Sequence, residues 1–183
     1  MTVPEGDGQI GMTMCPGRRD RLWFVALWQR DLEADFDRIA DWAPDLMITL
    51  VDNHELARLG VRNFARIAAA RVGNWRQLPI ADGGVPGNEF ERGWQSVGAE
   101  ARAIVKRGGR VLLHCRGGLG RTGTIAARLL VELGAKPEAA MITVRTVRPK
   151  AIETSAQEQH LRAQAPIVVD PPVGMVGMYE DRV

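Results

Sequence analysis

Apolar and polar positions along the chain form blocks that predict strands and helices in alternation. Short apolar runs predict strands at residues 22–28, 46–51, 75–80 and 110–114. Apolar residues at helical spacing predict helices at residues 31–40, 55–73 with a break at Gly60, 90–108, 125–133, 137–147 and 154–165. This alternation is typical of a mainly parallel sheet with helices on both faces, so we expect one α/β domain.

The first of these helices has a visible start. Asp31 is a candidate N-cap, and the apolar side chains that follow it at helical spacing are Leu32, Phe36, Ile39 and Ala40. The apolar run at residues 46–51 is continuous rather than alternating, which is typical of a strand buried on both faces. Residues 81–88 contain three glycines and a proline and predict a loop.

The two ends of the chain lack this periodicity. Residues 1–20 are rich in glycine, proline and charge, and residues 166–183 contain Pro171 and Pro172 together with two glycines. Such segments are typical of loops that are loosely docked on a domain. We therefore expect a single domain over residues 1–183 whose ends, 1–20 and 166–183, are loosely structured.

Composition narrows the class of protein. The chain has 183 residues, 45% of them apolar and 25% charged, which fits one ordinary globular domain. No apolar run approaches the roughly 18 residues of a membrane span, and the N-terminus lacks the pattern of a secretory signal. A net charge of +2 gives no argument for nucleic acid. We expect a cytoplasmic protein with neither a membrane nor a nucleic-acid partner.

The segment HCRGGLGRTG, residues 114–123, carries the strongest chemical signal. Cys115 follows a predicted strand and precedes a glycine-rich turn that opens a helix. Backbone N–H groups of such a turn converge on one point, and the helix dipole reinforces their attraction for an anion. An unperturbed thiol has a pKa of about 8.5, so a nucleophilic cysteine needs surroundings of this kind. The candidate phosphate-binding residues are Arg116, Gly117, Gly118, Leu119, Gly120 and Arg121, with the Arg121 fork on two phosphate oxygens.

Three more side chains have candidate roles. The Thr122 hydroxyl can donate to the sulfur as the sulfur departs, and His114 can order the loop through its ring nitrogens or be a satisfied, half-buried histidine. A departing alkoxide or phenolate needs an acid, and Asp82 in the loop PIADGGVP is the best candidate. By itself, Asp82 before two glycines is typical of a turn.

These residues resemble the cysteine-based protein phosphatases, in particular the dual-specificity group with kinase-associated phosphatases and their bacterial relatives. The resemblance covers about residues 46–161, through ELARLGV, PIADGGVP, HCRGGLGRTG and AIETSAQEQHL. It implies a protein tyrosine phosphatase-like fold, Cys115 as nucleophile, Arg121 as phosphate clamp, Asp82 as acid and then base, and Thr122 as a helper to the leaving thiolate. We expect that the reaction requires no metal and no organic cofactor.

Two assignments stay open at this point. Gln157 falls near a glutamine that positions the attacking water in several relatives, but Glu153 stands where some have a glutamine. A solvated helix face is the favoured reading of Gln157. Cys15 lies a hundred positions from Cys115, which fits neither a metal cluster nor a disulfide framework. An inert loop is favoured for Cys15 over a place at the pocket rim or a disulfide with Cys115.

The loop also bears on the substrate. Arg116 is the one basic side chain among its variable positions, which favours a phosphoprotein carrying Tyr or Ser/Thr phosphate over lipid or inositol phosphates. The expected reaction passes through a cysteinyl phosphate. The alternatives are a phosphatase of lipid, nucleotide or RNA 5′ phosphates, a rhodanese-like sulfurtransferase, and a phospho-binding module without catalysis.

Overall fold

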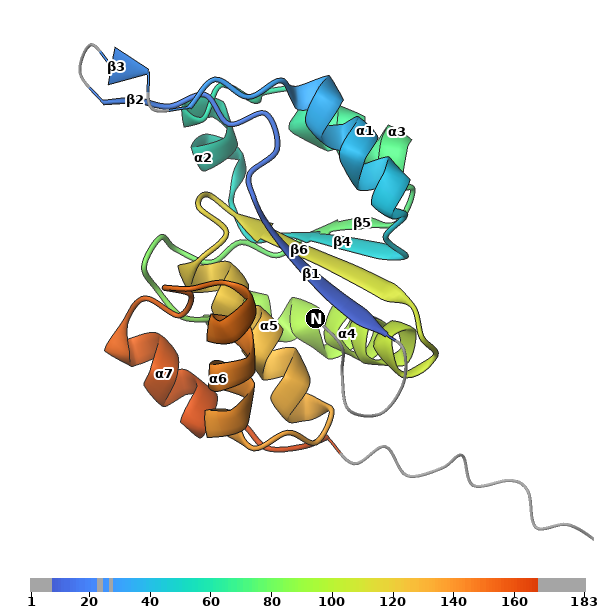
Figure 1. Ribbon diagram of the computed structural model, residues 1–183, viewed down its shortest axis with the longest axis vertical. Coiled ribbons are helices and arrows are strands. Elements are labelled where there is room, and N and C mark those ends of the chain that lie inside the picture. Colours follow the sequence, from blue (N-terminus) through green and yellow to red (C-terminus); the bar gives the residue numbers. More distant parts are fainter. Residues whose placement is uncertain (1–7, 23–24, 27, 168–183) are drawn as a thin grey trace, which may run out of the picture.

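The computed structural model describes residues 8–22, 25–26 and 28–167, and within them four parallel strands form the central sheet. In spatial order these strands are β1 (Gln9–Met14), β6 (Arg110–Cys115), β4 (Leu46–Thr49) and β5 (Trp75–Gln77) (Figure 1). The register places Met47 beside Leu112 and Thr49 beside His114 on the two central strands. The predicted parallel sheet is therefore confirmed.

Helices cover both faces of this sheet, as predicted. On one face lie α1 (Leu32–Trp42) and α3 (Phe64–Val72), and on the other lie α4 (Asn88–Lys106) and α5 (Gly120–Glu132) (Figure 1). The helices α6 (Pro137–Val147) and α7 (Ser155–Arg162) pack outside α5, and the short α2 (Asn53–Arg58) follows β4. No helix in the described ranges has the length and apolar character that crossing a bilayer requires.

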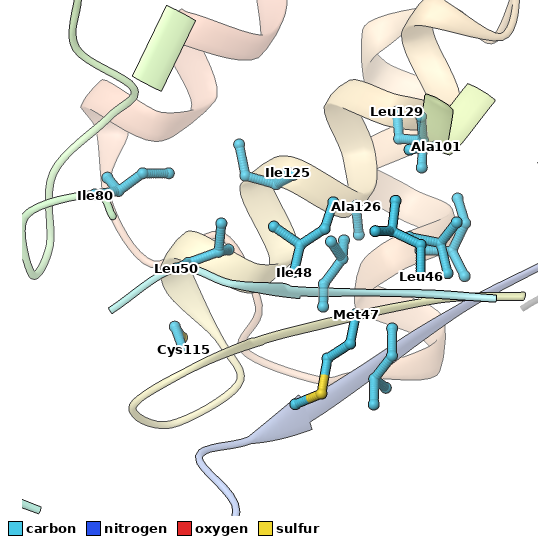
Figure 2. Close-up of a cluster of buried hydrophobic side chains, with 14 of the residues drawn as sticks. Leu46, Met47, Ile48, Leu50, Ile80, Ala101, Cys115, Ile125, Ala126 and Leu129 are labelled. Carbon is cyan, nitrogen blue, oxygen red and sulfur yellow. The ribbon is translucent and has the colours of Figure 1, made fainter. Parts of the chain in front are cut away.

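The strand β4 lies at the centre of the core. Figure 2 shows Leu46, Ile48 and Leu50 pointing toward the side chains of α5, whereas Met47 points to the opposite face. All four side chains are fully buried. Since both faces of the strand are covered, its sequence is a continuous apolar run instead of an alternating one.

The strand order creates a switch point at the carboxyl ends of β4 and β6. From β4 the chain crosses by α2 and α3 to β5 on one side, and from β5 it returns by α4 to β6 on the other side of β4. Crossovers in opposite directions leave a crevice between the ends of two neighbouring strands. Cys115 ends β6 at this place, beside Leu50, which follows β4.

The expectation of a loosely structured N-terminal end is wrong for the described part of it. Residues 9–14 form β1, which pairs in parallel with β6 from Gln9 beside Arg110 to Met14 beside Cys115. Ile10 is the one fully buried side chain of the strand, and Gly11 lies beneath the Trp42 ring. Its strand character thus comes from pairing with β6. Residues 1–7 and 168–183, including most of the expected loose tail, lie outside the described residues.

Two further boundaries and the burial of one residue differ from the prediction. Instead of one strand at 22–28, the short strands β2 (Arg21–Leu22) and β3 (Val25–Ala26) pair antiparallel, with residues 23, 24 and 27 outside the described part. The N–H groups of Trp28 and Arg30 donate to the carbonyls of Asp20 and Arg18 and continue this hairpin. The hairpin forms a sheet of its own, separate from the four-stranded sheet. The strand β5 is shorter than expected, and Ala40 is exposed rather than on the buried face of α1.

A buried ionic cluster joins α4 to α5. The Glu132 carboxylate accepts hydrogen bonds from the Trp94 indole at 2.8 Å, from Arg128 Nε at 2.8 Å and from Arg102. Arg128 also forms a bidentate pair with Glu91 and lies over the Trp94 ring. Buried charges are tolerated when they are paired in this way, so the cluster fixes how α4 meets α5.

Candidate active site

The loop between β6 and α5 is built so that its carbonyl groups face outward. The carbonyl oxygen of Arg116 accepts from the Cys15 N–H, and the carbonyl oxygens of Gly117 and Gly118 accept from Arg148 at 3.1 Å each. The Leu119 carbonyl accepts from the Gly123 N–H at 2.8 Å. In a trans peptide the N–H points away from the preceding C=O, so the N–H groups of residues 117–120 face the interior of the loop.

These inward N–H groups form an anion-binding cradle at the start of a helix. Gly118 has φ of +69°, and a Cβ on it would lie 2.5 Å from the Thr13 carbonyl oxygen, so the close approach of β1 requires glycine there. The first turn of α5 has N–H groups without intrahelical partners and adds the positive end of the helix dipole. The predicted phosphate loop thus has the geometry of a phosphate-binding cradle.

Arg121 stands in this loop as a buried cation. Its side chain is 2% exposed, and the Glu55 carboxylate of α2 accepts from Nη1 at 2.6 Å and from Nη2 at 2.7 Å. The Ile80 carbonyl accepts from Nη1 at 3.0 Å. Burial alone would lower the pKa of Arg121, but the bonds to Glu55 and the nearby Cys115 and Asp82 hold it above its ordinary value.

One edge of the Arg121 guanidinium is left for another anion. Glu55 and the Ile80 carbonyl occupy Nη1 and one hydrogen of Nη2. The second Nη2 hydrogen goes to Asp82 Oδ1 at 2.9 Å, and among the described residues none accepts from Nε. A phosphate forked on Nε and Nη2 would therefore have to take the place of the Asp82 carboxylate on Nη2.

Cys115 lies at the bottom of the pocket that these groups surround. The residue is 3% exposed, and it lines a cavity of about 460 Å³ with Arg121, Asp82, Arg116 and Glu153. The predicted nucleophile, clamp and acid thus share one cavity although 39 positions separate Asp82 from Arg121. No three His, Cys, Asp or Glu side chains gather to hold a metal ion in the described part of the chain.

The second cysteine lies beside this pocket but is of a different kind. Both thiols are free, and Cys15 is fully buried where β1 ends, with its N–H bonded to the Arg116 carbonyl. Burial, followed by the nearby Glu55 and Cys115, raises the pKa of Cys15 far above that of an ordinary thiol. Cys15 is therefore a neutral core residue under the loop, and of its alternatives the disulfide with Cys115 is absent.

His114 is buried completely, rather than half-buried, and it is bonded through both ring nitrogens. Nε2 lies 2.7 Å from the Thr49 hydroxyl, which also accepts from the Trp75 indole N–H, and Nδ1 lies 3.4 Å from the Cys115 carbonyl oxygen. Because Trp75 supplies one proton to Thr49, the hydroxyl proton is free to point at Nε2. Burial lowers the pKa of His114 to about 3, with Arg121 adding to the effect, so the ring is neutral and links β6 to β4.

The Thr122 hydroxyl is buried and has no hydrogen-bond partner among the described residues. Leaving a buried hydroxyl unpaired costs roughly 1–3 kcal/mol, so such a group calls for an explanation. Thr122 belongs to the first turn of α5, next to Arg121. The role expected for Thr122, to donate a hydrogen bond to the departing sulfur, needs a hydroxyl that is not bonded to another group, and this hydroxyl meets that requirement.

Gln157 has a different place from the solvated helix face that was favoured. Its side chain is fully buried; Oε1 accepts from the Glu153 N–H at 2.9 Å, and Nε2 donates to the Gly84 carbonyl at 3.1 Å. Together with Thr154 it forms a capping box at the start of α7. Gln157 therefore ties the loop that carries Asp82 to α7.

Two residues of the site escaped the sequence analysis, Glu55 and Arg148. Glu55 neutralises Arg121, and Arg148 binds the outward carbonyls of the loop. An acidic residue in the first turn is common on any surface helix, so the local sequence does not identify Glu55 as a site residue. The available signal is indirect, because a buried arginine in a phosphate loop needs a carboxylate partner from another segment.

Comparison with known proteins agrees with this geometry. A family model described as "PTP-SAK: Swiss Army Knife protein, DSP-PTPase phosphatase domain" matches residues 48–161. The rat protein "Cyclin-dependent kinase inhibitor 3" is 37% identical over 136 residues, which are 73% of this chain and 63% of the relative. The chain thus spans less than two thirds of the length of this curated relative.

Solved structures share the fold. A crystal structure of kinase associated phosphatase, with its catalytic-site cysteine replaced by serine, matches with a TM-score of 0.71 and 26% identity over 83% of each chain. The active form of Tk-PTP matches with a TM-score of 0.57 and 27% identity over 81% of this chain and 98% of the other. The observed sheet and helices are those of a protein tyrosine phosphatase fold.

The low pKa of His114 predicts how stability depends on pH. An unfolded histidine takes up a proton near pH 6.5, whereas the folded protein resists protonation of His114 down to about pH 3. The unfolded state therefore binds more protons in this window, and the free energy of unfolding falls as pH falls, by up to about 1.4 kcal/mol per pH unit. Urea unfolding of wild type and His114→Asn from pH 7.5 to pH 4 checks this. The two curves should be parallel above pH 7 and wild type should fall more steeply below pH 6.5; parallel curves throughout would contradict the assignment.

Proposed function

The chain belongs to the DSP-PTPase phosphatase domains of the PTP-SAK family, and from this premise we propose that it hydrolyses phosphate monoesters on proteins through a cysteinyl-phosphate intermediate. As a phosphatase of the protein tyrosine phosphatase fold it needs a nucleophile, an anion site and an acid. One observation carries the proposal: Cys115 and Arg121 lie at the two ends of a loop whose carbonyls all face outward, with Asp82 on Arg121.

In the first proposed step the substrate phosphate enters the cradle and forks onto Nε and Nη2 of Arg121. This displaces Asp82 from Nη2 and leaves its carboxyl at the pocket rim, where its side chain is 65% exposed. Once released from Arg121, Asp82 takes up a proton from solvent. The Cys115 thiolate attacks phosphorus, the bond from phosphorus to the leaving oxygen breaks, and Asp82 gives this proton to that oxygen. The inward N–H groups and Arg121 hold the equatorial oxygens.

In the second proposed step a water molecule attacks the phosphorus of the cysteinyl phosphate. Asp82, now a carboxylate, accepts a proton from this water, and the bond between phosphorus and sulfur breaks. The sulfur leaves as a thiolate, to which the unengaged Thr122 hydroxyl donates a hydrogen bond. Inorganic phosphate is released and Asp82 returns to its protonated form.

The charges at the pocket rim support a protein substrate. Arg116 is the basic side chain of the loop, and its guanidinium pairs with Asp20 at 3.0 Å and approaches Asp82 at 3.8 Å. Although partial burial opposes it, the bonds from Arg18 and Arg116 lower the pKa of Asp20, which stays charged. The rim has little surplus positive charge for a highly phosphorylated lipid or inositol headgroup. The names of the relatives, a kinase inhibitor and a kinase associated phosphatase, point the same way.

The nucleophile is tested by Cys115→Ser. Because a serine hydroxyl is far less ionised than a thiol, we expect turnover of an aryl phosphate to fall by at least about a thousandfold. Phosphate release is the measurement, with a thermal melt to show that the variant folds. Cys15→Ser is the matched control, since it makes the same change at the other cysteine and should retain turnover. Full activity of Cys115→Ser would reject the mechanism.

The acid is tested by Asp82→Asn on a series of aryl and alkyl phosphates. An amide cannot supply the proton, so the loss should grow as the leaving group becomes more basic, reaching about a hundredfold for poor leaving groups. The slope of log kcat/KM against leaving-group pKa is the measurement, and the exposed Glu89→Gln provides the control. An equal loss for good and poor leaving groups would remove Asp82 from the acid role.

A further inference from the structure

Three surface cavities that share lining residues form a series leading away from Cys115, which we call the groove. The cavity over Cys115 shares Asp82 and Arg116 with a second cavity of about 750 Å³, which runs along α2. The second shares Arg58 with a third of about 740 Å³, lined also by Arg19, Trp28 and Arg30. A polypeptide with its phosphorylated residue at Cys115 has room to continue through this groove.

The backbone brings two arginines together at the far end of the groove. The Arg19 N–H donates to the Leu59 carbonyl at 2.8 Å, which fixes the segment after β1 against the end of α2, where Arg58 lies. Arg19 Nε donates to the Arg30 carbonyl at 3.4 Å, which orients its side chain. Both guanidiniums are on exposed residues that line the third cavity.

Neither of these two arginines forms an ion pair with a described residue, whereas Arg30 pairs with Asp35. In the second cavity Asp52 and Glu55 lie with Arg58, but there Asp52 caps α2 and Glu55 pairs with Arg121. Asp31 lines the third cavity, but its carboxylate accepts from the Ala34 N–H as the cap of α1. The far end of the groove therefore has a surplus of positive charge.

We propose that Arg19 and Arg58 form a second anion subsite, which binds an acidic or phosphorylated side chain of the same substrate a few residues from the phosphate that is removed. This inference rests on the proposed protein phosphatase function. Guanidinium forks bind carboxylates and phosphates alike, and Trp28, which is 38% exposed, supplies an apolar surface for the stem of that side chain. The subsite makes the enzyme selective for phosphorylated residues in acidic or multiply phosphorylated segments.

A set of phosphopeptides tests this selectivity. Each peptide carries one phosphotyrosine at the centre, and a glutamate, a phosphoserine or a neutral glutamine is placed in turn at each of the four positions on either side. The measurement is the ratio of kcat/KM for the anionic peptide to that for its glutamine counterpart. At the best position we expect a ratio of about three to ten in wild type, since exposed ion pairs are individually modest. A larger ratio for phosphoserine than for glutamate would identify the second phosphate as the preferred ligand.

Variants show whether the two arginines are responsible. Arg19→Ala and Arg58→Ala should each lower the ratio, the double variant should bring it close to one, and Arg66→Ala on α3, exposed and outside the groove, should leave it unchanged. Raising the salt concentration should also lower the wild-type ratio. A merely structural role of Arg58 at the end of α2 would change the melting temperature without changing the ratio.

The outcomes separate this inference from the proposed function. Hydrolysis of all the peptides at equal rates, or a wild-type preference that survives in the double variant, would overturn the subsite alone. Failure to hydrolyse any peptide, beside good turnover of an aryl phosphate, would overturn the protein-substrate proposal and the subsite with it.

Discussion

The site depends on the neutralisation of one buried cation, Arg121. A guanidinium that is 2% exposed is tolerated only when carboxylates and carbonyls take its hydrogens. Its partners come from four places: the Leu50 carbonyl after β4, Glu55 of α2, the Ile80 carbonyl after β5, and Asp82 of the following loop. A single side chain thus draws the carboxyl end of the sheet, α2 and the acid loop to the start of α5.

The phosphate loop is held from outside, which leaves its interior free for an anion. Arg148 and the Cys15 N–H take its outward carbonyls, and the Ile152 N–H approaches the Leu119 carbonyl at 3.4 Å. Ile152 has φ of +61° although it is β-branched and buried. A conformation of this kind costs roughly 1–3 kcal/mol and persists where the surrounding structure imposes it. This strained residue lies beside the loop and close to α5, where a Cβ on Gly123 would be 3.0 Å from the Ile152 nitrogen.

The features of the fold and the site that could be predicted from the sequence are those that contiguous residues determine. The segment 114–123 predicts its own cradle, because the strand end, the glycines and the helix start are contiguous. The position of Asp82 at the pocket was predictable because it follows a strand whose carboxyl end meets the same edge of the sheet. The strand β1 was not predictable, since Gly11 and mixed polar positions hide a strand that only its pairing with β6 defines. Glu55 and Gln157 have the sequence pattern of ordinary surface helices. The partial burial of Glu55 and the complete burial of Gln157 result from tertiary contacts with Arg121 and Gly84.

The central claim is that Glu55 holds Arg121 in the orientation that leaves its Nε and Nη2 edge for phosphate. The most direct measurement is kcat/KM of Glu55→Gln for an aryl phosphate, beside a thermal melt that confirms folding. The amide keeps the shape of the side chain but loses the charge and one of the two acceptor oxygens, so we predict a loss of at least about tenfold in a folded protein. A folded Glu55→Gln variant with wild-type kcat/KM would contradict the account.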